Sequence, residues 1–192
     1  MPWPPRFLFL SNRLSIDFTL TGGEGERAHL ERWNSPRDLQ DWYEASSLAL
    51  SLRSLGPDDL VAAKELREVL WAGAQATISG SRPGRAVWRA LERAAAHPDL
   101  VPVHRRGKLG WSPDSTPAQA LSSVARDGLV LFGSDLRHRL RECKNPHCRL
   151  LFVDTSRPGR RAWCAMRRCG NLEKTSRYRR KRAAKAKQGP TP

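Results

Sequence analysis

The four cysteines constrain the fold of this chain more than any other feature. Cys143, Cys148, Cys164 and Cys169 are its only cysteines, and they form two pairs with the same internal spacing, C-x4-C. Zinc prefers four tetrahedral ligands, and thiolate sulfurs suit a structural site. No export signal is evident, so we expect a reducing cytoplasm, where paired cysteines favour a metal over a disulfide. The spacing therefore predicts one structural Zn²⁺ ion with four cysteine ligands.

The residues around the cysteines predict a small finger. Asn145-Pro146 is a turn signal inside the first pair, as a metal-binding knuckle needs. We expect residues 150–153 to form a strand, residues 154–159 a turn and residues 160–163 a returning strand. A helix then follows the second pair. The predicted layout of knuckle, hairpin, knuckle and helix is treble-clef-like.

The segment that contains the cysteines is strongly basic. Gly170 allows an unusual backbone angle, and Asn171 can cap a helix that runs to about Lys187. Residues 1–136 contain 16 basic and 16 acidic side chains, whereas residues 137–192 contain 18 basic and three acidic ones, so the whole net charge of +15 lies in the second part. Such a module binds a polyanion, most often nucleic acid and less often an anionic membrane. A solvated tail is the alternative, but the interleaved cysteines and aromatic residues favour a folded module.

We interpret this module as a nucleic-acid-binding finger, with duplex DNA as the first hypothesis. Basic side chains on phosphates give affinity without sequence preference. The candidate contacts are Arg157, Arg160, Arg161, Arg167, Arg168, Lys174, Arg177, Arg179, Arg180, Lys181, Arg182 and Lys185. RNA is an alternative partner, since Phe152, Trp163 and Tyr178 could stack on unpaired bases, although the core of the finger is the favoured place for Phe152 and Trp163. An acidic protein partner is a third hypothesis.

An enzyme is the least expected class of protein. Four cysteine ligands leave no open metal position for a substrate. His29, His97 and His104 are scattered, and none has a spaced partner that would make a catalytic or metal site. His138 and His147 could serve as ligands only if a cysteine were displaced. We therefore expect no catalytic residues and no cofactor other than zinc.

The first 136 residues predict a mainly helical domain. Ser35-Pro36, Gly56-Pro57 and Thr116-Pro117 each have the character of a helix start. The alternation of Ile16, Phe18 and Leu20 with polar residues favours a strand, and a helix of similar extent is the alternative. Residues 100–112 favour a short β-hairpin. The expected fold class is mainly α, of the α+β type. It comprises a helical domain (1–136), a finger with a basic helix (137–187) and a disordered tail (188–192).

The sequence leaves two interpretations of the tryptophans in the helical domain. Its tryptophans are Trp33, Trp42, Trp71, Trp88 and Trp111. They suit core packing, while an aromatic-lined pocket for a small-molecule effector is the alternative. No apolar stretch is long enough to span a bilayer, so we expect no membrane partner and a cytoplasmic, nucleoid-associated protein. The sequence does not decide the oligomeric state. A dimer is one alternative, because proteins that bind palindromic operators usually are dimers.

The C-terminal residues resemble a known family. The motif comprises the cysteine pair Cys143–Cys148, the runs 152–157 (FVDTSR) and 160–166 (RRAWCAM), and 169–174 (CGNLEK). It is similar to the CGNR zinc finger, a bacterial module that typically follows a helical domain called ABATE in candidate stress-induced transcription regulators. Residues 14–18 and 35–39 are similar to the ABATE pattern. Leu172 stands where the motif has arginine, and metal binding should survive this change. We expect the phosphate or base contact of that arginine to be lost here unless Arg167, Arg168 or Arg177 replaces it.

Overall fold

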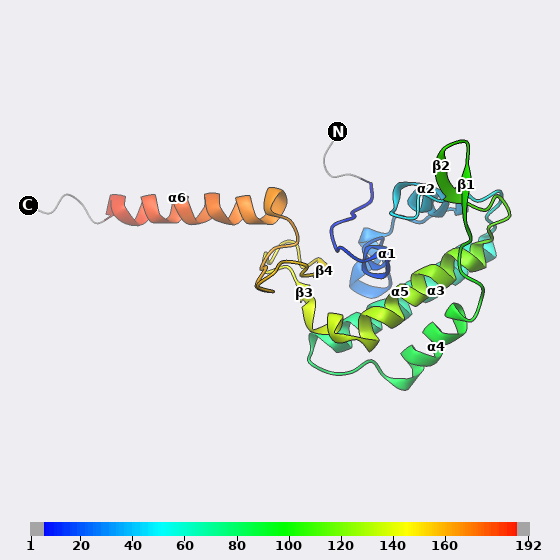
Figure 1. The fold of residues 1–192 in the computed structure, drawn as a ribbon. Helices are drawn as coiled ribbons and strands as arrows, with labels where there is room; N and C mark the ends of the chain where they lie inside the picture. The colour runs from blue at the N-terminus through cyan, green and yellow to red at the C-terminus, as the bar shows by residue number, and fades with distance from the viewer. Residues whose placement is uncertain (1–5, 188–192) are drawn as a thin grey trace, which may run out of the picture.

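The chain folds into a helical body, a small finger and a projecting C-terminal helix (Figure 1). The computed structural model describes residues 6–187, without the side chains of residue 177 and residues 181–187. The α-helices are α1 (Leu14–Thr19), α2 (Pro36–Ala45), α3 (Pro57–Ile78), α4 (Arg85–Ala95), α5 (Pro117–Gly133) and α6 (Asn171–Lys187), and the short helical turns are η1 (Gly25–Leu30), η2 (Asp135–Arg139) and η3 (Met166–Gly170). The strands are β1 (Pro102–Arg105), β2 (Lys108–Trp111), β3 (Leu140–Glu142) and β4 (Leu151–Val153). The predicted fold class is confirmed, while the predicted tail, residues 188–192, lies outside the described residues.

The predicted helix starts at Ser35, Gly56 and Thr116 are confirmed. The Ser35 hydroxyl accepts the Asp38 amide hydrogen, and the Asp38 carboxylate accepts the Ser35 amide hydrogen in return. Thr116 and Gln119 form the same reciprocal pair at the start of α5. These contacts satisfy amide groups that have no partner within the helix. Proline at the first helical position has no amide hydrogen to satisfy.

Two glycines let α3 and α5 pack closely. The two helices lie side by side, with α4 packed against both (Figure 1). A Cβ atom on Gly73 of α3 would lie 2.7 Å from Cε2 of the buried Phe132 ring. A Cβ atom on Gly128 of α5 would lie 2.5 Å from Cδ2 of Leu70, which is also buried. These close approaches place the main core along the α3–α5 contact.

The strand favoured near residues 14–20 is wrong and the alternative helix is confirmed, because the segment forms α1. Its alternating pattern arises from burial on all sides, since Ser15, Ile16, Asp17, Phe18 and Thr19 are all buried. The Ser15 amide and hydroxyl both donate to the Asp127 carboxylate of α5, at 2.9 and 2.5 Å. The Thr19 hydroxyl donates to the Ile16 carbonyl at 2.8 Å. Satisfied polar groups inside the core hide the helical period of the apolar residues.

The tryptophans near α2 form part of the core. The rings of Trp33 and Trp42 are fully buried and lie edge to face with Phe18, at centroid distances of 4.7 and 5.0 Å. Tyr43 packs on Trp42 at 5.6 Å. Such edge-to-face pairs favour a rigid core. For Trp33 and Trp42 the structure therefore supports packing over an aromatic pocket.

The predicted hairpin at residues 100–112 is confirmed as β1 and β2. The strands pair antiparallel from Pro102 with Trp111 to Arg105 with Lys108. Arg106 and Gly107 form the two-residue turn with positive φ angles of 50° and 77°, as a tight hairpin turn requires. The indole Nε1 of Trp111 donates to the Leu48 carbonyl at 2.6 Å. This bond connects the hairpin to the segment that follows α2 in the sequence. None of the helices described here is long and apolar enough to cross a membrane.

The finger uses a different strand pair from the predicted one. Strand β4 pairs antiparallel with β3, Leu140 opposite Val153 and Glu142 opposite Leu151. The predicted returning strand at residues 160–163 is wrong, because that segment is irregular. Its Arg161 amide donates to the Asp154 carboxylate at 2.7 Å, and the Ala162 carbonyl accepts the Lys144 amide hydrogen at 2.9 Å. These two bonds fold the segment across the finger without forming a ladder.

Candidate metal centre and basic helix

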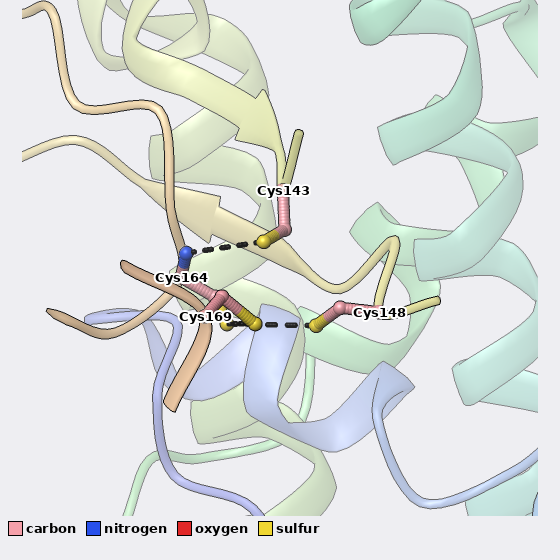
Figure 2. Close-up of side chains that lie close together, drawn as sticks. All are labelled: Cys143, Cys148, Cys164 and Cys169. Carbon is pink, nitrogen blue, oxygen red and sulfur yellow. Dashed lines mark hydrogen bonds between the residues drawn. The ribbon is translucent and has the colours of Figure 1, made fainter. Parts of the chain in front are cut away.

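The first cysteine pair lies on the turn of the β3–β4 hairpin. Cys143 directly follows β3, and its amide donates to the Leu150 carbonyl at 2.9 Å. Between the strands, the Cys148 amide donates to the Asn145 carbonyl at 2.9 Å, and the His147 amide donates to the Asn145 side-chain oxygen at 3.0 Å. Arg149 then takes a positive φ angle of 50°. The tight turn directs both sulfur atoms to the same side, as the knuckle prediction requires (Figure 2).

The second cysteine pair lies at the start of the C-terminal helix. Cys164 precedes η3 and Cys169 lies within it, where its amide donates to the Ala165 carbonyl at 2.9 Å. The helical turn therefore begins at Met166, and Asn171 has helical angles, so the predicted cap at Asn171 is wrong. Gly170 is a packing requirement and not a positive-φ position, because a Cβ atom there would lie 2.5 Å from the Met166 sulfur.

The four sulfur atoms are spaced as a tetrahedral metal site requires. They all lie within 4.8 Å of one another (Figure 2). Sγ of Cys164 lies 3.6 Å from Sγ of Cys148 and 3.7 Å from Sγ of Cys169. These distances are too long for a disulfide bond, and all four cysteines are free thiols. A tetrahedral zinc–thiolate site with Zn–S bonds of about 2.3 Å places its sulfurs about 3.8 Å apart. The cluster is able to hold one such ion, and four ligands complete its coordination.

The protonation of the thiols shows how strongly they interact. The hydrogen bond between Cys148 and Cys164, as the largest cause, lowers the pKa of Cys148 to about 5 and raises the pKa of Cys164. Burial, as the largest cause, raises the pKa of Cys169 to about 11. Three of the four cysteines are buried and Cys148 is half-buried. A metal ion would replace the shared protons, so its binding must release protons and weaken at low pH.

Side chains around the cluster hold the cysteine loops in place. The guanidinium of Arg161 donates from Nε to the Trp163 carbonyl at 2.8 Å and from Nη2 to the Cys164 carbonyl, and it lies over the Phe152 ring at 4.8 Å. Phe152 is fully buried and packs with the cysteines, together with the partly buried Trp163. The core role expected for both aromatic residues is therefore supported. His138 and His147 do not belong to the metal-binding cluster of the described residues.

Two family profiles match the chain. The CGNR zinc finger matches residues 139–182, which contain the four cysteines. ABATE, described as a "putative stress-induced transcription regulator", matches residues 12–135, well over half of the chain. The chain belongs to the ABATE family. Both resemblances read from the sequence are thus confirmed, and a search of curated proteins finds no match.

The finger shares part of its packing with the ABATE domain. Alternate side chains of β4 face opposite ways, so Leu151 and Val153 join the main core while Phe152 joins the cysteine cluster. The Val153 amide donates to the Ser11 carbonyl at 2.7 Å, and the Asn12 amide group donates to the Val153 carbonyl at 2.9 Å. The sequence did not predict these contacts. The loop is distinguished by the positive φ angle of Asn12, 63°, and a backbone angle cannot be read from the sequence. The N-terminal loop thereby fixes the finger on the domain.

The predicted nucleic-acid contacts divide into exposed and engaged side chains. Arg157, Arg160, Arg167, Lys174, Arg179 and Arg180 are exposed, whereas Arg161 and Arg168 are half-buried. The side chains of Arg177, Lys181, Arg182 and Lys185 lie outside the described residues. The exposed Tyr178 also lies on α6. Helix α6 projects away from the body, so its faces are open to a partner (Figure 1).

Proposed function

We propose that this protein is a zinc-dependent DNA-binding transcription regulator of the cytoplasm. One structural Zn²⁺ ion, held by Cys143, Cys148, Cys164 and Cys169, would fold the finger and fix the direction of α6. The observation that carries this proposal is the direct passage from the last cysteine into a projecting basic helix. A helix of this kind can reach the phosphates of a duplex or enter its major groove.

The distribution of charge supports a polyanionic partner. On α6 the only described ion pair joins Arg180 to Glu173 at 2.8 Å, and both side chains are partly exposed. Lys174 and Arg179 have no carboxylate partner among the described residues. Exposed basic side chains without ion pairs can release counterions when they neutralise phosphates. Arg161 is not part of this surface, because its guanidinium is bound to backbone carbonyls.

A salt titration of duplex binding tests the proposal. If about five phosphates are neutralised, log Kobs should fall with log salt concentration with a slope of roughly −4 to −5. The experiment uses the zinc-loaded full chain and a labelled duplex in fluorescence anisotropy. A response that is flat with salt would contradict the electrostatic basis of the proposal.

RNA is the second candidate partner, and one observation favours it. Tyr178 is 61% exposed on the basic helix, where an aromatic ring can stack on an unpaired base. Phe152 cannot do so, because it is fully buried. Competition between the labelled duplex and a structured RNA distinguishes the two: stronger competition by RNA, lost in Tyr178→Ala, would replace DNA as the partner. Four cysteine ligands would leave a zinc ion no open position for a substrate, so we propose a binding function and no reaction.

The ABATE domain has a separate proposed role as a sensor of a small molecule. Its attachment to the finger through β4 and the N-terminal loop offers a physical route for a ligand to change the finger. A thermal-shift screen of the zinc-loaded full chain against metabolites tests this role. The absence of any stabilising compound would leave the domain as a scaffold for the finger.

A further inference from the structure

A basic cavity lies where the ABATE domain meets the finger. It has a volume of about 440 Å³ and opens between the end of α3 with its following loop and the segment of η2 and β3. Ser81 and Arg82 line it from the loop, and Arg137, His138 and Arg141 line it from the opposite side. Figure 1 shows α6 leaving the finger on one side and the α3–α4 loop lying beyond β3 on the other. None of the residues that line the cavity belongs to α6, so the cavity is separate from the projecting helix.

The arginines of this cavity are not neutralised. Among the ion pairs of the described residues, none involves Arg82, Arg137 or Arg141. One acid, Glu142, also lines the cavity, and it is paired with Arg149, Oε1 to Nε at 2.6 Å. Three guanidinium groups around one hollow repel each other, and an anion placed among them would offset that repulsion.

The guanidinium groups also retain free hydrogen-bond donors. Nη1 of Arg137 donates to the Ser134 carbonyl at 3.0 Å, and Nη1 of Arg141 donates to the Leu140 carbonyl at 3.2 Å. Each guanidinium has five N–H donors, so these bonds use a small part of the capacity. The Arg82 side chain makes no hydrogen bond within the described part of the chain. Planar guanidinium forks match the oxygen atoms of phosphate groups in pairs.

We propose that this cavity binds a small phosphorylated molecule that carries at least two phosphate charges. Its size falls within the usual range for small-molecule sites. Arg82 would approach the phosphates from the domain, and Arg137 and Arg141 from the connection to the finger and from its first strand. The ligand would join the two parts of the protein and is thus placed to act as the effector. That regulatory consequence rests on the proposed function, whereas the binding itself does not.

Thermal unfolding and calorimetric titration with inorganic pyrophosphate test the site, using the zinc-loaded full chain at about 0.15 M salt to suppress loose ion binding. Pyrophosphate should raise the Tm of the wild type. Arg82→Gln removes an exposed loop side chain without intramolecular bonds, so the fold should persist while pyrophosphate affinity falls about tenfold or more. Arg82→Gln with Arg141→Gln should abolish the shift in Tm.

The matched control removes the same charge nearby. Arg85→Gln with Arg89→Gln changes two exposed arginines of α4 that do not line the cavity, and this variant should respond like the wild type. Absence of stabilisation in the wild type, or equal loss in both double variants, would overturn the proposal. Duplex binding without pyrophosphate should be the same in Arg82→Gln and wild type; a loss there would assign the cavity to the nucleic-acid interface and also overturn it. Failure of all duplex binding would instead count against the proposed function alone.

Discussion

Asp17 is a buried carboxyl group that links α1 to the loop on which the finger docks. Its Oδ1 accepts the amide hydrogens of Leu10 and Ser11 at 3.1 and 3.0 Å, and Ser11 in turn binds β4. Burial, the largest cause, raises the pKa of Asp17 to about 6. The native state therefore binds a proton on the Asp17 carboxyl group more tightly than the unfolded state does.

The pH dependence of stability follows from that shift. Because the folded pKa is raised from 3.8, the contribution of Asp17 is most favourable below about pH 4 and is lost as the pH rises through 6. The loss amounts to about 2–3 kcal/mol in the free energy of unfolding. Asp17→Asn keeps an oxygen acceptor. It should remove the fall in the free energy of unfolding with rising pH that urea unfolding measures between pH 4 and 7. Glu92→Gln, on the exposed face of α4, should retain it; an unchanged slope in Asp17→Asn would refute the assignment.

Arg161 has a positioning role at the cysteine cluster. Lysine keeps the charge but cannot reach the Trp163 and Cys164 carbonyls together, nor lie flat on Phe152. Arg161→Lys should therefore lower zinc affinity about tenfold, as measured by chelator competition. Arg160→Lys, at an exposed neighbouring position, is the control and should bind zinc like the wild type. Equal zinc affinities in both variants would contradict the positioning role and leave Arg161 as a candidate phosphate contact.

Leu172 lies where the family motif has arginine, and it is 62% exposed in the first turn of α6. Leu172→Arg would add one cation to the proposed duplex-binding surface. The salt slope of duplex binding should become steeper by roughly 1, with higher affinity at low salt. Leu109→Arg adds the same charge to the exposed face of β2 and should leave the slope unchanged. A steeper slope in both variants would show that net charge, and not the position of Leu172, decides affinity.

At the scale of elements, local chemistry could predict most of the helices and the β1–β2 hairpin. Serine, threonine and proline at helix starts act through contacts within four residues, as do Arg106 and Gly107 in the hairpin turn. The sequence could not decide between a strand and a helix at α1, because its buried Ser15 is satisfied by Asp127, far away in the sequence. The partner of β4 was also missed, since Asp154 and the Ala162 carbonyl hold residues 160–163 away from a ladder.

The contact of α3 with α5 offers a test of packing between elements. Gly73→Ala would place a methyl group against three atoms of the buried Phe132 ring, at 2.7 to 3.2 Å. Overpacking costs about 1–3 kcal/mol, and the gain in helix propensity of about 1 kcal/mol offsets part of it, so chemical unfolding should show a net loss. Gly133→Ala, where the nearest atom is Trp88 Cη2 at 3.9 Å, should be neutral or slightly stabilising. Equal effects of the two substitutions would contradict the close approach.

At the scale of the whole molecule, β4 belongs to both the ABATE domain and the finger. Leu151 and Val153 pack in the main core, so the body of the protein supports one side of the hairpin even without metal. The second cysteine pair has no such support, because Cys164 and Cys169 pack only within the finger cluster of the described residues. The cysteine spacing could predict this cluster from the sequence, but it could not predict that the finger and the domain share a strand.

Removal of zinc should therefore release α6 while leaving the ABATE domain folded. The most direct test measures binding of a labelled duplex by the full chain, loaded with zinc, after chelation, and after return of one equivalent of zinc. Chelation should weaken binding about tenfold or more at about 0.15 M salt, because metal binding and folding of such modules are coupled. One equivalent of zinc should restore it. Equal affinity and equal salt slope with and without zinc would show that the basic tail binds as an unfolded chain, and would contradict a finger that directs α6 onto nucleic acid.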